Sequence, residues 1–158
     1  MYQMFGHAFV TSDGVELPGL GILDLYTEAG RKRMIGNIVT RSTLWDPPRT
    51  LAGFENHAGR TYLGSSVKPL GEVIYGHGNN GEDKTEGAVY NNVIGTYLHG
   101  ALLPKNPWLT DYLLQKAVAY RNQQFAFKTL DESMELQAHR AAVQLTRSPW
   151  HKLRSSRF

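Results

Sequence analysis

The histidine at position 99 is the residue of this chain best placed for acid–base chemistry. It ends the apolar run 93–98 and is followed at once by Gly100, a neighbour too small to cover the ring. An imidazole titrates near neutral pH and can both accept and deliver a proton. His99 is therefore a candidate for proton transfer to or from a nucleophile.

The sequence offers no obvious nucleophile to accompany His99. It contains no cysteine, which excludes a thiol nucleophile, a thiolate metal site and a disulfide within it. No serine lies in a G-x-S-x-G elbow. The histidines show no i, i+4 pair and no clustered carboxylates, so we expect no metal ion and no other cofactor. His139 and His151 are expected at the surface.

The segment 76–81, GHGNNG, matches the pattern G-x-G-x-x-G of dinucleotide-binding loops. In such loops a helix follows, and its N-terminus binds the phosphates. Here the next residues are EDKTEG, which do not begin a helix. We therefore predict a hairpin turn and no nucleotide site.

Length and composition indicate a folded domain, and the distribution of charge disfavours a nucleic-acid-binding protein. A chain of 158 residues with 41% hydrophobic residues is typical of one folded domain. No apolar run approaches the length of a membrane span, and no signal peptide opens the sequence, so we expect a cytoplasmic protein. Four basic residues fall in 147–158, which leaves 13 basic and 14 acidic residues before it. This distribution indicates a basic tail, 148–158, and disfavours nucleic-acid binding.

The pattern of elements predicts strands first and helices last. We expect strands within 34–39, 51–63, 71–75, 88–90 and 93–98, and a proline-rich loop at 43–50. Asn106 and Pro107 indicate an N-cap and first turn of a helix, and Thr129 with Glu132 has the form of a capping box. The apolar face of this last helix is expected at Met134, Ala138, Ala141 and Leu145.

The first residues have apolar side chains at Met1, Met4, Phe5 and Ala8, the spacing of one helix face, but no N-cap precedes them. We expect a helix whose start, with whatever preceded it, lies outside the sequence. The whole pattern indicates the C-terminal part of a layered α/β domain covering 1–147.

Three long blocks resemble the class I glutamine amidotransferase domains of the cobyric-acid-synthase (CobB/CobQ-like) type. They are GFENHAGRTYLG at 53–64, GHGNNGEDKTEG at 76–87 and NVIGTYLHGALLPKNPWL at 92–109. Within this family the resemblance is greatest to the amidotransferase subunits of lipid II isoglutaminyl synthases. It implies a flavodoxin-like three-layer fold, here without its first strands.

The resemblance also implies roles for individual residues. Family members use a cysteine on a strand-to-helix elbow to attack glutamine, and a histidine to move the protons. Tyr2 and Gln3 match the end of an elbow that reads like C-G-G-Y-Q, so Gln3 is implied to contact the substrate and the cysteine would precede Met1. His99 matches the catalytic histidine.

Two more residues are candidates for the site. Many class I members have Glu two residues after the histidine, where this chain has Ala101, and in the related subfamily a partner subunit can supply the acid. Glu55 is a candidate for that acid within the chain; it could equally be a structural hydrogen-bond acceptor. Arg33 matches an arginine that is thought to meet glutamine, and its fork suits an α-carboxylate. It could equally be a solvated residue of the run 31–33.

The resemblance implies a subunit that hydrolyses glutamine and passes ammonia to a Mur-ligase-like, ATP-using synthetase, which amidates D-glutamate of lipid II in peptidoglycan synthesis. The alternatives are the amidotransferase domain of cobyric acid synthase in cobalamin biosynthesis, a non-catalytic binding module, or a fragment. Without a thiol the chain alone is expected to be inactive. With strands missing from its sheet it is expected to form homo-oligomers when isolated.

Overall fold

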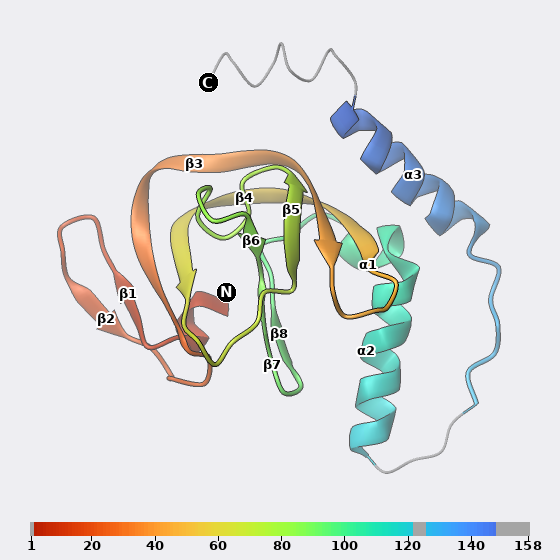
Figure 1. Ribbon diagram of the computed structural model, residues 1–158, viewed down its shortest axis with the longest axis horizontal. Coiled ribbons are helices and arrows are strands. Elements are labelled where there is room, and N and C mark those ends of the chain that lie inside the picture. The colour runs from red at the N-terminus through yellow and green to blue at the C-terminus, as the bar shows by residue number, and fades with distance from the viewer. Residues whose placement is uncertain (1, 122–125, 148–158) are drawn as a thin grey trace.

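Two long antiparallel strands, β3 (Leu25–Ser42) and β4 (Arg49–Leu63), form the centre of the protein. They arch across the body in the computed structural model, which describes residues 2–121 and 126–147 (Figure 1). Leu25 pairs with Leu63 and Ser42 with Arg49, and the register shifts once, between Ala29 and Met34. Buried and exposed residues alternate along much of β4, as in a strand with one covered face.

Shorter strands extend this sheet, in the order β2-β1-β3-β5-β6 with β4 also paired to β3. The β1–β3 pair is parallel, and the remaining pairs of the described sheet are antiparallel. A separate hairpin, β7–β8, follows the sheet. The bounds of these strands are β1 (Ala8–Val10), β2 (Glu16–Pro18), β5 (Gly71–Tyr75), β6 (Thr85–Glu86), β7 (Ala88–Tyr90) and β8 (Val93–Gly95).

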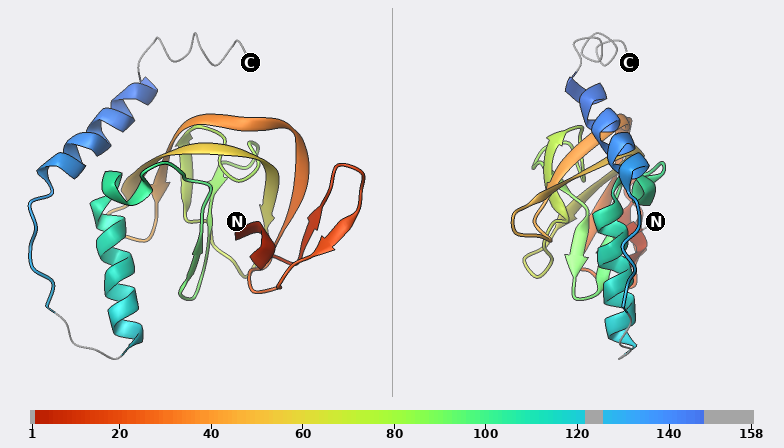
Figure 2. Two further views of the ribbon diagram at one scale, coloured as in Figure 1. Left: turned by 180° about the vertical axis from the view of Figure 1, so that it is seen from behind. Right: turned by 90° about the vertical axis from the view of Figure 1, so that its right-hand side faces the viewer.

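The helices come last and lie together at one end of the sheet, as the front, back and side views show (Figures 1 and 2). They are the single turn α1 (Leu102–Lys105), α2 (Pro107–Tyr120) and α3 (Ser133–Arg147). The predicted α/β class, with a central sheet followed by C-terminal helices, is confirmed. None of the described helices is both long and apolar enough to cross a membrane.

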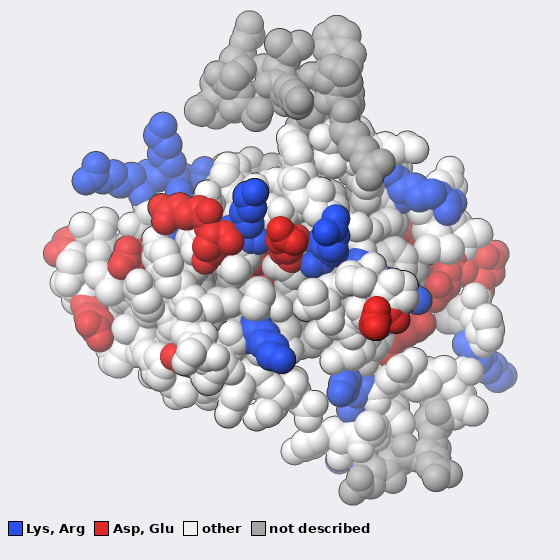
Figure 3. Space-filling view, in the orientation of Figure 1, with Lys and Arg blue, Asp and Glu red and all other residues white. Residues whose placement is uncertain are grey.

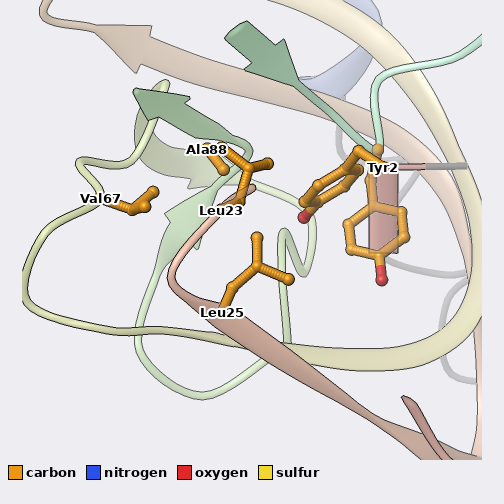
Figure 4. Packing of buried hydrophobic residues seen from close by; sticks show 6 residues of the cluster. Tyr2, Leu23, Leu25, Val67 and Ala88 are labelled. Carbon is orange, nitrogen blue, oxygen red and sulfur yellow. The ribbon is translucent and has the colours of Figure 1, made fainter. Parts of the chain in front are cut away.

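Two hydrophobic clusters form the core, and adjacent residues join them. Tyr97 packs in the first cluster and Leu98 in the second. The stretch that leads to His99 is therefore anchored on two sides. The first cluster, most of which Figure 4 labels, contains Tyr2, Leu23, Leu25, Val67, Ala88 and Tyr97. The second contains Ile38, Leu51, Leu70, Leu98 and Leu109.

The predicted N-terminal helix is mostly wrong. Residues Tyr2–Phe5 form only a short 3-10 helix, η1, and Ala8–Val10 continue as β1. Ala8 pairs with Tyr26 of β3 and with Pro18 of β2. A short apolar run fits either period, and here the hydrogen bonds of the sheet decide between them.

The predicted start and apolar face of the last helix are also wrong. Helix α3 begins at Ser133, whose N–H donates to Asp131 Oδ1, so the Thr129–Glu132 capping box does not form. Met134 is 78% exposed and Leu145 54% exposed.

His139 of the same helix was expected at the surface, yet it is only 7% exposed. Its Nδ1 lies 2.9 Å from the Lys105 carbonyl oxygen, and its Nε2 lies 2.9 Å from Thr50 Oγ1. These partners satisfy the ring inside the protein, so α3 packs through the side of the helix that carries His139.

Asn106 begins α2 as predicted, but its side chain does not cap the helix. The amide instead binds both the N–H and the carbonyl of Ala52 in β4, each at 2.9 Å, and donates to the Leu102 carbonyl. Asn106 therefore joins the helical end of the protein to the central sheet.

The hairpin predicted at 76–81 is confirmed, because residues 76–84 connect β5 to β6 and these two strands pair antiparallel. Acidic and basic side chains are interspersed on the face shown in Figure 3, in keeping with a nearly neutral body. The basic tail at 148–158 and His151 lie outside the described residues.

Candidate active site

The buried face of β4 places four residues of the GFENHAGR block and its continuation in one row. Side chains two residues apart point to the same face of a strand. Accordingly Glu55, His57, Gly59 and Thr61 are all buried, whereas Asn56 between the first two is exposed. Three of the four carry polar side chains, so this face must satisfy them from within the protein.

Glu55 is completely buried and binds the loop that follows β5. Its carboxylate accepts the N–H groups of His77 at 2.9 Å and of Gly78 at 3.0 Å, and lies 2.6 Å from His77 Nδ1. Gly78 has φ +71°, and a Cβ there would lie 2.2 Å from the Thr85 carbonyl oxygen, so this close approach requires glycine. The glycine-rich loop thus binds a carboxylate of its own chain.

These contacts do not join Glu55 to the imidazole of His99. The sequence offered Glu55 as a possible acid for that histidine, or as a structural acceptor. Its hydrogen bonds are those of a structural acceptor, and a catalytic role for Glu55 stays a prediction.

His57 is held as a neutral imidazole with one bare nitrogen. Its Nδ1 lies 3.0 Å from the Gly59 carbonyl oxygen and therefore carries the proton, and its ring stacks on Tyr97 with centroids 3.5 Å apart. Nε2 is buried without a hydrogen-bond partner in the described structure. Burial lowers the pKa of His57 to about 4, and the nearby charges of Arg60 and His99 add to the effect.

Gln3 lies in a chain of side-chain hydrogen bonds that begins at Tyr97. Gln3 Nε2 donates to Tyr97 Oη at 2.6 Å, and the same hydroxyl lies 2.7 Å from Thr61 Oγ1. Thr61 in turn contacts Thr27 Oγ1 at 2.8 Å. A Cβ at Gly59 would lie 2.3 Å from Gln3 Nε2, so only glycine leaves room for this glutamine. Gln3 is 4% exposed and is held beside the strand.

His99 is exposed while its backbone is fixed to β4. Its N–H donates to the Phe54 carbonyl at 2.7 Å, and the N–H of Phe54 donates to its carbonyl at 3.1 Å. Tyr97, two residues earlier, connects this segment to Gln3. Tyr97 therefore brings Gln3, His57 and His99 into one region: it accepts a hydrogen bond from Gln3, stacks on His57 and lies two residues before His99.

Arg33 lies apart from that region. It is exposed, and its guanidinium donates two hydrogen bonds to Asn56 Oδ1, from Nη2 at 2.7 Å and from Nε at 3.0 Å. Asn56 belongs to the exposed face of β4, opposite Glu55 and His57. Arg33 is thus ordered by a neighbour instead of freely solvated, and its contact with a substrate stays a prediction.

His57 and Tyr97 are site residues that the sequence interpretation missed. The sequence spacing could have indicated His57, because residues two apart in a strand share a face and Glu55, His57 and Thr61 follow this spacing. Nothing local indicated that Tyr97 would stack on His57, because 40 positions separate them in the chain. Among the described residues no three His, Asp or Glu side chains are grouped closely enough to hold a metal ion.

Comparison with known proteins identifies the family of this chain. A CobB/CobQ-like glutamine amidotransferase domain matches residues 1–107, a range that contains Gln3, the buried face of β4 and His99. The chain belongs to this family.

Two bacterial relatives are GatD subunits of lipid II isoglutaminyl synthases. The chain is 49% identical over 142 residues to the GatD subunit of the glutamine-hydrolysing lipid II isoglutaminyl synthase of Staphylococcus aureus, which covers 90% of this chain and 56% of the relative. It is 42% identical over 118 residues to the corresponding Streptococcus pneumoniae subunit, covering 74% and 45%.

A third relative is more distant. A probable cobyric acid synthase of Methanosphaera stadtmanae is 34% identical over 110 residues, which cover 63% of this chain and 22% of the relative. The chain spans about half the length of the two GatD relatives, and less of the cobyric acid synthase.

Proposed function

We propose that this chain provides the histidine-bearing part of a glutaminase subunit in a lipid II isoglutaminyl synthase. The single observation that supports this most is the placement of His99, exposed for proton transfer yet fixed to β4 by two backbone hydrogen bonds. The higher identity to the GatD subunits favours lipid II over a corrin carboxylate as the final acceptor of the ammonia.

The chemistry would need a thiol from outside this sequence. A cysteine thiolate would attack the carboxamide carbon of glutamine, ammonia would leave after taking a proton from the His99 imidazolium, and water would then cleave the thioester to glutamate. Gln3 would contact the substrate beside His99, and Arg33, which lies apart from them, would have to turn away from Asn56 to reach the same molecule. Since the sequence contains no cysteine, we expect the purified chain to release no glutamate. Release of glutamate that is lost in His99→Ala would contradict this proposal.

Glutamine binding tests the proposal without requiring catalysis. An NMR titration of the labelled chain with L-glutamine should shift the resonances of Gln3, Tyr97 and His99, and titration with D-glutamine should not. Arg33→Ala should weaken the L-glutamine response about tenfold if its fork binds the α-carboxylate. Arg31→Ala, in the same exposed basic run, is the matched control and should change nothing. Equal responses to both enantiomers would exclude a substrate pocket.

The partner of this subunit would be a Mur-ligase-like synthetase that uses ATP to activate the D-glutamate carboxyl group of lipid II. Such a partner would work in the cytoplasm, where ATP is available. Co-expression with the other subunit of the Staphylococcus aureus synthase should give a complex that survives gel filtration. A chain that elutes alone under these conditions would favour a binding module for some other protein.

Self-association of the isolated chain is part of the same proposal. Strand β2 lies at an edge of the sheet and all three of its residues are exposed. Leu20 nearby is 67% exposed and Ile22 45% exposed. An exposed sheet edge beside apolar side chains promotes pairing between chains. Light scattering should show a dimer or larger assembly, and a monodisperse monomer would contradict it.

A further inference from the structure

The residues between β8 and His99 lack strand partners, although they determine where His99 lies. The β7–β8 ladder ends with Gly95 opposite Ala88, and the next backbone pairing is that of His99 with Phe54. The N–H groups of Tyr97 and Leu98 lie between these two pairings. Buried N–H groups need acceptors, and here the acceptors come from side chains.

Glu86, the last residue of β6, provides the first acceptor. Its Oε1 accepts the Thr96 hydroxyl at 2.5 Å and the Tyr97 N–H at 2.8 Å. Thr96 Oγ1 then accepts the Leu98 N–H at 3.0 Å. One carboxylate oxygen therefore holds two successive residues directly and a third through the threonine hydroxyl. All three immediately precede His99.

Burial of the Glu86 carboxylate costs free energy. It is completely buried, and its second oxygen, Oε2, has no hydrogen-bond partner in the described structure. Burial raises the pKa of Glu86 to about 7, and the nearby Glu55 carboxylate adds to this rise. The carboxylate is present in spite of this cost, and its hydrogen-bonded oxygen supplies the acceptor that the Tyr97 N–H needs.

A second connection links Glu86 to the residues that begin the chain. The adjacent Gly87 N–H donates to Asn79 Oδ1 at 2.8 Å, and the same oxygen accepts the Tyr2 hydroxyl at 2.7 Å. The ring of Tyr2 packs edge-on against Tyr97 with centroids 5.0 Å apart. The segment around Glu86 thus contacts both the His99 strand end and the Tyr2–Gln3 turn.

We propose that Glu86 is a positioning residue for His99, which acts by ordering residues 96–98 through its single hydrogen-bonded oxygen. The ordering of residues 96–98 by Glu86 does not depend on the proposed function. Only the role of His99 in proton transfer rests on it. Its tests are therefore spectroscopic, and they can fail while glutamine binding succeeds, or succeed while glutamine binding fails.

Amide hydrogen exchange and the ring-proton chemical shifts of His99 test this arrangement. In Glu86→Leu, which removes the acceptor at similar size, the Tyr97 amide should exchange about tenfold faster or more. Amides of β3 and β4 should keep their protection, and the His99 ring resonances should move. Glu86→Gln retains an acceptor oxygen and should restore both readouts. Glu72→Leu, on the exposed side of β5, is the matched control and should leave both unchanged.

The titration of Glu86 gives a second signature. In the natural chain the Tyr97 amide shift should change with a midpoint near pH 7, and Glu86→Gln should abolish this change. The titratable groups that face Glu86 are Glu55, Tyr2 and Tyr97. The two tyrosines have pKa values raised above 10 and cannot produce a midpoint near 7.

A milder variant guards against global unfolding of Glu86→Leu. Thr96→Val is nearly isosteric and removes only the hydroxyl that connects Glu86 to Leu98, so it should raise the exchange rate of the Leu98 amide and shift the His99 ring resonances. Unchanged His99 resonances in folded Glu86→Leu, or in Thr96→Val where the former does not fold, would overturn the proposal.

Discussion

Two fully buried glutamates lie in the same site and are satisfied to different degrees. Glu55 uses both oxygens, which bind the N–H groups of His77 and Gly78 and the imidazole of His77. Glu86 uses one oxygen, and the other is bare. The first is the structural anchor of a loop. The second holds the residues that precede His99, and its charge depends on pH near neutrality.

The difference shows that burial by itself does not determine how a carboxylate behaves. Desolvation disfavours the charged form of Glu86, and its single hydrogen-bonded oxygen offsets this only in part. Four predictions test whether the number of satisfied atoms is the property that separates these residues.

Replacement of Glu55 by leucine should have the largest effect. It leaves the His77 and Gly78 N–H groups without their acceptor, so the free energy of unfolding should fall by about 4 kcal/mol. Chemical denaturation at pH 7 measures this loss. Glu72→Leu, which removes an exposed carboxylate, should change stability by less than about 0.5 kcal/mol. Equal losses in the two variants would show that Glu55 anchors nothing.

Replacement of Glu86 by glutamine should change the pH dependence of stability. The folded-state pKa of about 7 lies above the ordinary 4.5, so the natural chain binds more protons folded than unfolded in this window. Its stability should therefore fall by about 3 kcal/mol as pH rises from 4 to 8 through this group. Glu86→Gln should lack that component. If the stability of the natural chain and of Glu86→Gln changed with pH in the same way, the raised pKa of Glu86 would be refuted.

His57 is a base with one nitrogen that lacks a hydrogen-bond partner in the described structure. Its effect on the pH dependence of stability is opposite in sign to that of Glu86. Its folded pKa of about 4 lies below the ordinary 6.5, so folding releases protons between these values. Stability should be lost as pH falls from 6.5 to 4, by about 3 kcal/mol, because the buried imidazole must take up a proton to charge. His57→Phe keeps the stacking on Tyr97 and should remove this acid sensitivity. An unchanged acid slope in the variant would count against a neutral, buried His57.

His139 is the histidine counterpart of Glu55, because both ring nitrogens have partners. His139→Leu should cost about 1 kcal/mol and speed proteolysis of α3, since the bonds to Thr50 and Lys105 are lost. Met134→Ala on the exposed side of the same helix is the control and should be neutral within about 0.5 kcal/mol. Similar effects of the two changes would mean that His139 does not hold the helix in place.

Local patterns predicted much of the fold. The strand predicted within 51–63 forms most of β4, the Gly/Asn segment predicted the hairpin between β5 and β6, and Asn106–Pro107 predicted the start of α2. The GTYLHG block pointed to His99 and to the family. These features depend on neighbours within a few positions, where periodicity and turn chemistry act directly.

Other features were decided by partners far away in the sequence. The apolar spacing of α3 favoured burial of Met134 and Leu145, but docking on β4 buried His139 because Thr50, 89 positions earlier, offered it a hydrogen bond. Likewise nothing near Glu55 showed that it would bind His77, and nothing near Glu86 showed that it would reach Tyr97.

The sequence by itself therefore determined the types of the later elements, the family and the candidate histidine, all of which depend on local composition and spacing. The tertiary structure alone decided which polar groups meet and which atoms are left without a partner. Those outcomes depend on burial and on distances between segments that a linear pattern does not contain, and they set the charge states of Glu86 and His57.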